Sequence, residues 1–151
     1  MILYLDTSAL VKRYVIEAGT DEVNDATEHA VTAGTAIICR AEVAAALAKA
    51  VRTGTLKQSD ALASLEKFRS EWSDLIRVQV SERLVARADA LVWEHGLRGY
   101  DAVHLAAALV WQEALGESVT FATFDAALWR AAEREGLIPF PVDLSTRKAQ
   151  K

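Results

Sequence analysis

The chain has 151 residues, enough for one domain that buries a core of its own. It carries 17 basic and 21 acidic residues, a net charge of −4, so its general surface is not expected to attract polyanions. Binding of nucleic acid would then require local basic patches or a metal ion that neutralises acidic groups. A single cysteine, Cys39, excludes an internal disulfide bond. Because there is also no signal-peptide pattern and no apolar stretch long enough to cross a bilayer, we expect a cytoplasmic protein without membrane association.

Short apolar runs typical of buried strands alternate with segments of helical periodicity. Strands are expected over residues 2–5, 36–39, 75–80, 119–124 and 137–140. Helices are expected directly after Asp6, from Thr20 to about Gly34, and over residues 42–52, 59–72, 81–95, 101–115 and 125–134, with the pair 42–52 and 59–72 forming a hairpin. This alternation predicts a parallel sheet covered on both faces, a helix-rich three-layer α/β/α sandwich. Residues 1–144 are predicted to form one domain, and the polar, basic segment 145–151 a mobile tail.

Four acidic residues stand beside apolar or small residues. Asp6 follows the first strand, Asp125 follows the run from Val119 to Phe124, and Glu42 and Asp101 lie in the first turns of two helices. Carboxylates next to core segments are costly to desolvate unless they are paired, hydrogen-bonded or bound to a cation. In open parallel sheets, ligands bind beyond the carboxyl ends of the strands, near the point where the strand order reverses. We therefore expect the four carboxylates to converge at one edge of the sheet.

An oxygen-rich ligand set of this kind suits Mg²⁺ or Mn²⁺, and the shortage of cysteine and of paired histidine argues against zinc. Without a cation, clustered carboxylates should repel one another and their pKa values should rise. The hydroxyls of Thr7, Ser8 and Thr123 could fix the carboxylates or a metal-bound water. Each acid also has a purely structural alternative, because an acidic residue at a helix start can cap the helix or interact favourably with the helix dipole. That alternative is strongest for Asp125.

Four segments around these acids resemble the motifs of the PIN-domain ribonucleases, and within them the VapC-type toxins of bacterial toxin–antitoxin pairs. They are Asp6 to Lys12, Arg40 to Val43, Arg98 to Ala106, and Thr123 to Asp125 with the following Leu128, Ala131, Ala132, Gly136 and Leu137. Their order, their spacing and the chain length are similar to those of the family over nearly the whole chain. One departure is that the predicted strand Ala36 to Cys39 lacks the serine that such proteins often carry before the second acid.

The resemblance implies a PIN-like fold and an Mg²⁺-dependent endoribonuclease, with Mn²⁺ as a possible substitute, that hydrolyses RNA to leave a 5′-phosphate and a 3′-hydroxyl. It also implies a cognate antitoxin protein as inhibitor and a homodimer. All four acids would be catalytic and would bind metal. Asp6 and Asp101 would be the principal ligands, Asp125 a direct or water-mediated ligand, and Glu42 a ligand or a water-orienting base.

Two basic residues, Arg40 and Arg98, stand beside motifs and are the best candidates for contacts to substrate phosphates. His104, one turn after Asp101, is interpreted as a satisfied histidine within a packed helix, although it could orient a ligand. Two other functions stay open. A PIN-like RNA-binding or scaffold subunit that does not cleave would bind no ion. A metal-dependent phosphatase of the haloacid-dehalogenase type would need a second aspartate two residues after Asp6, where this chain has Ser8.

Overall fold

The computed structural model describes residues 1–144, so the prediction of a mobile tail over residues 145–151 lies outside the described residues. Its centre is a sheet of five parallel strands in the order β3-β2-β1-β4-β5. The strands are β1 (Ile2–Leu5), β2 (Thr32–Ala36), β3 (Ile76–Val78), β4 (Val119–Ala122) and β5 (Ile138–Phe140). The chain builds the sheet outward from β1 to β3, then returns to place β4 on the other side of β1. The strand order therefore reverses between β1 and β4, where ligands bind in sheets of this kind.

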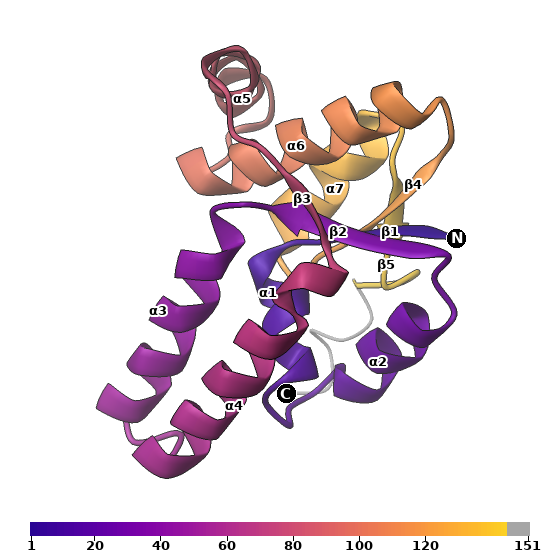
Figure 1. Ribbon diagram of the computed structural model, residues 1–151. Helices are drawn as coiled ribbons and strands as arrows, with labels where there is room; N and C mark the ends of the chain where they lie inside the picture. The colour runs from indigo at the N-terminus through magenta and orange to yellow at the C-terminus, as the bar shows by residue number, and fades with distance from the viewer. Residues whose placement is uncertain (145–151) are drawn as a thin grey trace.

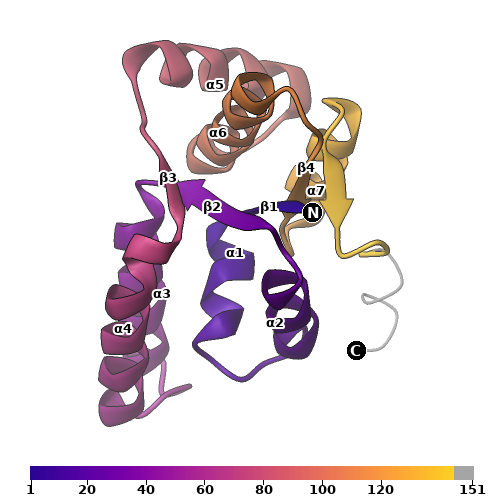
Figure 2. The same ribbon diagram turned by 45° about the vertical axis from the view of Figure 1, so that its right-hand side comes forward.

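Helices cover both faces of the sheet (Figure 1). On one side lie α1 (Thr7–Leu10), α2 (Thr20–Glu28), α3 (Cys39–Arg52) and α4 (Gln58–Glu71), and on the other lie α5 (Glu82–His95), α6 (Gly99–Leu115) and α7 (Ala126–Arg134). The helices α3 and α4 form the predicted hairpin, which projects away from the sheet in Figure 2. The three-layer α/β/α sandwich is thus confirmed. No helix within residues 1–144 is both long and apolar enough to cross a membrane.

Successive side chains of β1 point to opposite faces of the sheet, and the core accordingly forms two clusters, one on each face. Tyr4 packs into the cluster beneath α5, α6 and α7, whereas Leu3 and Leu5 pack into the cluster beneath α1 to α4, and all three side chains are fully buried. The next residue, Asp6, leaves the strand with its backbone N–H bonded to the carbonyl of Ala122 at the end of β4. Core packing on both faces therefore determines where the first acidic side chain emerges.

The structure corrects one predicted region, between Thr20 and Glu42. The helix that begins at Thr20 ends at Glu28 rather than near Gly34, and the second strand is Thr32–Ala36 rather than residues 36–39. Cys39 is the first residue of α3 instead of the last residue of a strand.

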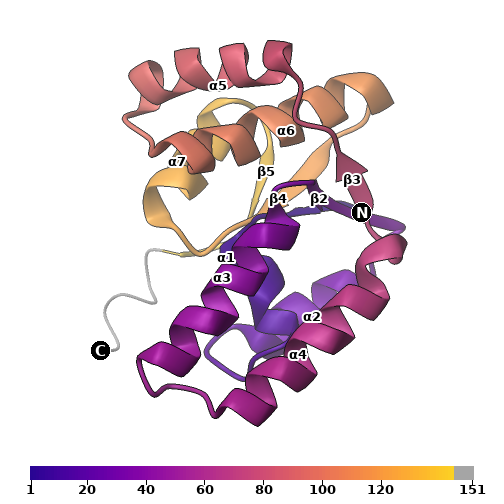
Figure 3. The ribbon, with the colours of Figure 1, turned by 60° about the vertical axis from the view of Figure 1, so that its left-hand side comes forward.

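The reason for the shift is packing of α6 across β2. A Cβ on Gly34 would lie 2.9 Å from Cη2 of Trp111, so the aromatic ring of α6 occupies the space that a side chain would need. A strand of small residues fits under α6. The prediction relied on local hydrophobicity, which favoured the run from Ile37 to Cys39 and carries no information about a contact with α6. Figure 3 shows α5 and α6 side by side above the sheet.

Candidate active site at the carboxyl edge of the sheet

Asp6 is buried at the end of β1 and caps α1. Its Oδ1 accepts hydrogen bonds from the backbone N–H of Ala9 at 2.9 Å and from Oγ of Ser8 at 2.7 Å, and its Oδ2 accepts one from Oγ1 of Thr123 at 2.6 Å. Burial raises the pKa of Asp6 above its usual value, and this effect exceeds the lowering effects of nearby His104 and of the three hydrogen bonds. The carboxylate is thus held in a fixed orientation in surroundings that favour neutralisation of its charge.

Thr123 and Ser8 connect the start of α1 to the loop after β4. Oγ1 of Thr123 also accepts a hydrogen bond from the backbone N–H of Asp125 at 3.1 Å, and Oγ of Ser8 accepts one from the N–H of Phe124 at 2.9 Å. These contacts place Asp125 beside Asp6 across the switch point. Ser8 and Thr123, two of the three predicted hydroxyl residues, therefore orient Asp6 and the loop that carries Asp125.

Asp125 is the N-cap of α7, since its Oδ1 accepts a hydrogen bond from the N–H of Leu128 at 2.9 Å. Its second oxygen faces Arg98. Nε of Arg98 donates to Oδ2 of Asp101 at 2.8 Å, and Nη2 reaches Oδ2 of Asp125 at 3.5 Å. The hydrogen bond and charge of Asp101, with the charge of Asp125, raise the pKa of Arg98. Asp125 therefore caps a helix with one oxygen and shares a cationic partner with Asp101 through the other.

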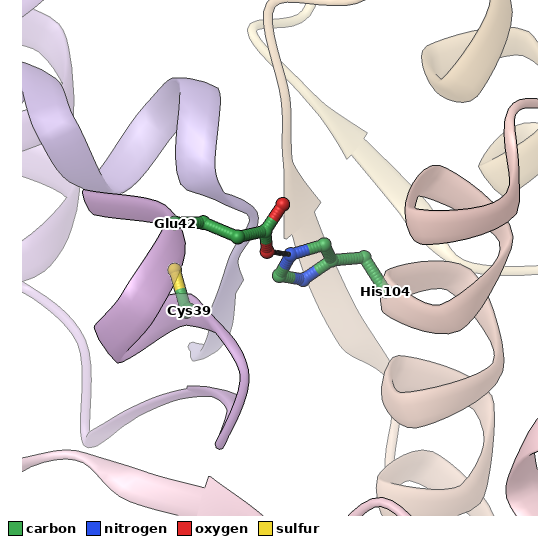
Figure 4. Close-up of side chains that lie close together, drawn as sticks. All are labelled: Cys39, Glu42 and His104. Atoms are coloured by element: carbon green, nitrogen blue, oxygen red, sulfur yellow. Dashed lines mark hydrogen bonds and ion pairs between the residues drawn. The ribbon is translucent and has the colours of Figure 1, made fainter. Parts of the chain in front are cut away.

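Glu42 lies in the first turn of α3 and meets α6 through His104 (Figure 4). Its Oε1 accepts hydrogen bonds from Nε2 of His104 at 2.7 Å and from Oγ1 of Thr7 at 2.9 Å. Burial acts to raise the pKa of Glu42, but the contacts with His104 and Thr7 outweigh burial and hold that pKa below its usual value. The expectation that clustering raises the pKa of each acid is therefore wrong for Glu42.

Shared partners join the four predicted acids into one network. Asp6 and Asp125 meet through Thr123, Asp125 and Asp101 through Arg98, and α6 connects Asp101 to the contact between His104 and Glu42. Within residues 1–144, however, no three of the four carboxylates have oxygens that all lie within 4.8 Å of one another. The structure thus places the acids around one edge of the sheet without drawing them all to the separation of ligands on one ion.

A different group near this edge, Cys39, Glu42 and His104, does bring its donor atoms within 4.8 Å of one another. Burial raises the pKa of the Cys39 thiol to about 12, so at neutral pH it stays protonated, and its Sγ lies 3.2 Å from Oγ1 of Thr7. The hydrogen bonds already account for the arrangement of these side chains. The remaining donors of the edge are carboxylate and hydroxyl oxygens, which fit a hard divalent cation such as Mg²⁺.

The two predicted arginines lie in different places. Arg98 is at the acidic edge, whereas the exposed Arg40 has its guanidinium carbon 5.9 Å from the ring centre of Trp72 and lines a groove between α3 and α4. The hydroxyl of Tyr4 lies 2.9 Å from Nδ1 of His104, the partner of Glu42. The sequence analysis missed this residue, because a tyrosine in an apolar strand is typical of a core position. The sequence analysis also gave too little weight to His104. This histidine is the one polar residue between Ala102 and Trp111, and that isolation in an apolar helix could have indicated a role in the site.

The fold and this acidic edge define an α/β domain of the PIN type, and comparison with known proteins agrees. The family model described as PIN domain matches residues 3–134, so the chain belongs to the PIN-domain family. The structure is similar to the crystal structure of PAE2754 from Pyrobaculum aerophilum, with a TM-score of 0.62 and 22% identity over 99% of this chain and 100% of that one. At this identity the second likeness supports the fold alone.

Within the family, the chain is similar to two proteins of Mycobacterium tuberculosis, Ribonuclease VapC45 and Ribonuclease VapC49. Each is 31% identical over 144 residues, which cover 95% of this chain and 97% of the relative. The resemblance to VapC-type PIN proteins that the four motifs indicated is therefore confirmed.

Proposed function

We propose that residues 1–144 form a nuclease domain and that the protein is an Mg²⁺-dependent endoribonuclease, the toxin of a type II toxin–antitoxin pair. The observation that carries the proposal is the buried carboxylate of Asp6 at the switch point, connected through Thr123 to Asp125, which shares Arg98 with Asp101. Membership of the PIN family and the similarity to two proteins named as ribonucleases support the choice of RNA as substrate.

In this proposal Asp6, Asp101, Asp125 and Glu42 hold Mg²⁺, or Mn²⁺ in its place. When bound, the cation supplies charge neutralisation and activates a water for in-line attack on phosphorus. Asp6 needs no rearrangement of its own, because Ser8, Ala9 and Thr123 fix both of its oxygens. Glu42 has a lowered pKa, so it is ionised at neutral pH and serves as a ligand of the cation or as a hydrogen-bond acceptor that orients the attacking water.

Arg98 is the proposed contact to the substrate phosphate. Its side chain is 79% exposed while its guanidinium already lies beside Asp101 and Asp125, so it can reach a phosphate bound at the same edge. Arg40 lies on α3 outside the network of the four acids, and we assign it to contacts farther along the RNA.

The proposal includes a cytoplasmic homodimer and a cognate antitoxin as inhibitor. Support for self-association comes from α5 and α6, between which an apolar groove of about 300 Å³ opens beside Val85, Val92 and Val103. On the same helices Trp93 and Tyr100 are 86% and 68% exposed, and aromatic side chains are enriched at protein interfaces. Sedimentation velocity will show a dimer if this assignment is correct and a monomer at all concentrations if it is wrong.

The central test is RNA cleavage with Mg²⁺ or Mn²⁺, with and without a chelator, by the wild type and by Asp101→Asn. We expect the chelator to abolish cleavage and the substitution to reduce it by about 100-fold or more, since even residues that only support metal ligands contribute about 10- to 100-fold. Asp60→Asn is the matched control, because Asp60 is also a first-turn acid, at the start of α4.

Three outcomes would contradict the proposal in different ways. Cleavage unaffected by both the chelator and Asp101→Asn rules out the metal site. Binding of RNA without an ion and without cleavage favours a scaffold subunit. Hydrolysis of a small phosphomonoester but not of RNA favours a phosphatase.

A further inference from the structure

A hydrogen-bonded chain runs from the centre of the sheet to the edge where the acids lie. The hydroxyl of Tyr4, a fully buried residue of β1, lies 2.9 Å from Nδ1 of His104, and Nε2 of His104 lies 2.7 Å from Oε1 of Glu42. These hydrogen bonds join β1, α6 and α3, three elements that are far apart in the sequence. In Figure 4 the imidazole and the carboxylate reach toward each other from α6 and α3.

Both nitrogens of His104 are held, so its ring has one orientation. An ionised carboxylate can only accept hydrogen bonds, so Nε2 carries the hydrogen that points at Glu42. Burial raises the pKa of Tyr4 well above its usual value, so its hydroxyl keeps its proton and remains a partner for Nδ1. The Tyr4 ring is itself fixed by stacking on Phe121, with centroids 5.3 Å apart and planes 7° from parallel. A rigid support of this kind is what orients ligands in metal sites.

The contacts on Glu42 are uneven between its two oxygens. His104 and Thr7 both bond to Oε1, whereas Oε2 accepts no hydrogen bond from the described part of the chain. Without these partners, a glutamate in the first turn of a helix with a side chain 28% exposed would move among several rotamers. The pair of contacts removes that freedom and leaves one oxygen available.

We propose that Tyr4 and His104 are positioning residues of the nuclease: they hold Oε1 of Glu42 so that Oε2 is presented to the cation or to the attacking water. This inference rests on the proposed function, because it gives Glu42 a role there. It assigns no direct contact with substrate to His104, which is 2% exposed.

The protein offers a matched control in a second, partly buried histidine–glutamate pair. Nε2 of His95 lies 2.7 Å from Oε1 of Glu135, with side chains 5% and 23% exposed, close to the 2% and 28% of His104 and Glu42. His95 ends α5 and Glu135 follows α7, so this pair has no contact with the four acids. His95→Phe therefore removes the same kind of interaction at a place unrelated to the site.

The experiment compares His104→Phe, His104→Gln, Tyr4→Phe and His95→Phe with the wild type. Four quantities are measured: the Kd for Mn²⁺ by electron paramagnetic resonance of the free ion, kcat and KM for RNA cleavage, and the thermal unfolding midpoint without metal. For His104→Phe we expect an Mn²⁺ Kd raised and a kcat lowered by about 10-fold or more, with KM for RNA within about twofold of wild type.

His104→Gln keeps a donor toward Glu42 and should recover most of the lost affinity. Tyr4→Phe retains the stacked ring and should show a smaller loss, about threefold, since only the hold on Nδ1 is removed. His95→Phe should lower the unfolding midpoint as His104→Phe does, but leave kcat unchanged. The Mn²⁺ Kd of this variant is not used as a control, because His95 and Glu135 form with Glu94 a second group whose donor atoms lie within 4.8 Å of one another.

The positioning role is overturned if His104→Phe binds Mn²⁺ as the wild type does, or loses no more kcat than His95→Phe. If His104→Phe is unfolded, the same comparison is made between His104→Gln, Tyr4→Phe and wild type, and equal Kd and kcat values in all three overturn the role. A wild type that binds no ion contradicts the proposed function itself, and the positioning role with it, whereas normal wild-type binding and cleavage with silent variants contradicts the positioning role alone.

Discussion

The two halves of the acidic edge are held together by different means. Asp6 and Glu42 are oriented by hydroxyls, a backbone N–H and an imidazole that are themselves packed into the fold. Asp101 and Asp125 are joined by the guanidinium of Arg98, whose side chain is 79% exposed. A buried donor stays in place when a cation binds, but an exposed arginine can leave. The first half is therefore preorganised, and the second half is the part that adjusts to its cation.

The largest expected effect concerns Asp125, which combines a helix cap with a proposed metal ligand. Asp125→Asn keeps the cap, because an asparagine oxygen accepts from the N–H of Leu128 equally well, whereas Asp125→Ala removes it and should lower the free energy of unfolding by about 1 kcal/mol. Both variants should lose cleavage by about 100-fold or more if the charge is needed for metal. Urea unfolding and cleavage rates measured on both variants separate the two roles. If Asp125→Asn cleaves RNA normally, Asp125 is only a cap.

The preorganised half contains two acids whose pKa values shift in opposite directions. Because the pKa of Asp6 is raised on folding, its contribution to stability is greatest below the unfolded-state value of 3.8 and is lost as the pH rises through the folded-state pKa. Because the pKa of Glu42 is lowered, its contribution is present above 4.5 and is lost as the pH falls through the folded-state pKa.

At neutral pH without metal, Asp6→Asn should then be at least as stable as the wild type. Glu42→Gln should be less stable by about 1 kcal/mol, because partial exposure to solvent reduces the roughly 1.5–3 kcal/mol of a hydrogen bond to a charged group. The deficit of Glu42→Gln should shrink as the pH falls below 4.5, the usual value of a glutamate. Unfolding free energies in chelator across this range test the comparison. A marked loss of stability in Asp6→Asn would show that the hydrogen bonds of Asp6 outweigh its burial.

The smallest effect is expected in the adjustable half. Arg98→Gln should change the free energy of unfolding by less than about 1 kcal/mol, because the ion pairs of this exposed side chain are screened by solvent. It should tighten Mn²⁺ binding a few-fold by removing a competing cation from Asp101 and Asp125, and raise KM for RNA by losing a phosphate contact. Calorimetric titration and cleavage kinetics measure the two changes. Weaker Mn²⁺ binding in Arg98→Gln would mean that Arg98 orients the acids rather than competing for them.

The local sequence pattern was sufficient to predict the position of a residue wherever that position depends on its neighbours in the sequence. Asp6 follows a strand of four apolar residues, and Asp125 caps a helix shortly after the buried strand β4, so both positions at the carboxyl edge could be predicted. The sequence pattern did not predict the bounds of β2. This strand has small residues, and Trp111 of α6 packs against its Gly34. That contact spans 77 residues and leaves no periodic trace in either segment.

The amino-acid sequence by itself determined the alternation of strands and helices, the parallel three-layer fold, and the four acids with the hydroxyls of Thr7, Ser8 and Thr123 around them. These features follow from hydrophobic period, helix-start chemistry and the cost of leaving a carboxylate beside a core segment. Only the tertiary structure decided that Arg98 bridges Asp101 and Asp125 and that Tyr4 holds His104 against Glu42. These contacts depend on the position of α6 between the sheet and α5. That position results from packing across the whole domain rather than from the sequence of any one segment.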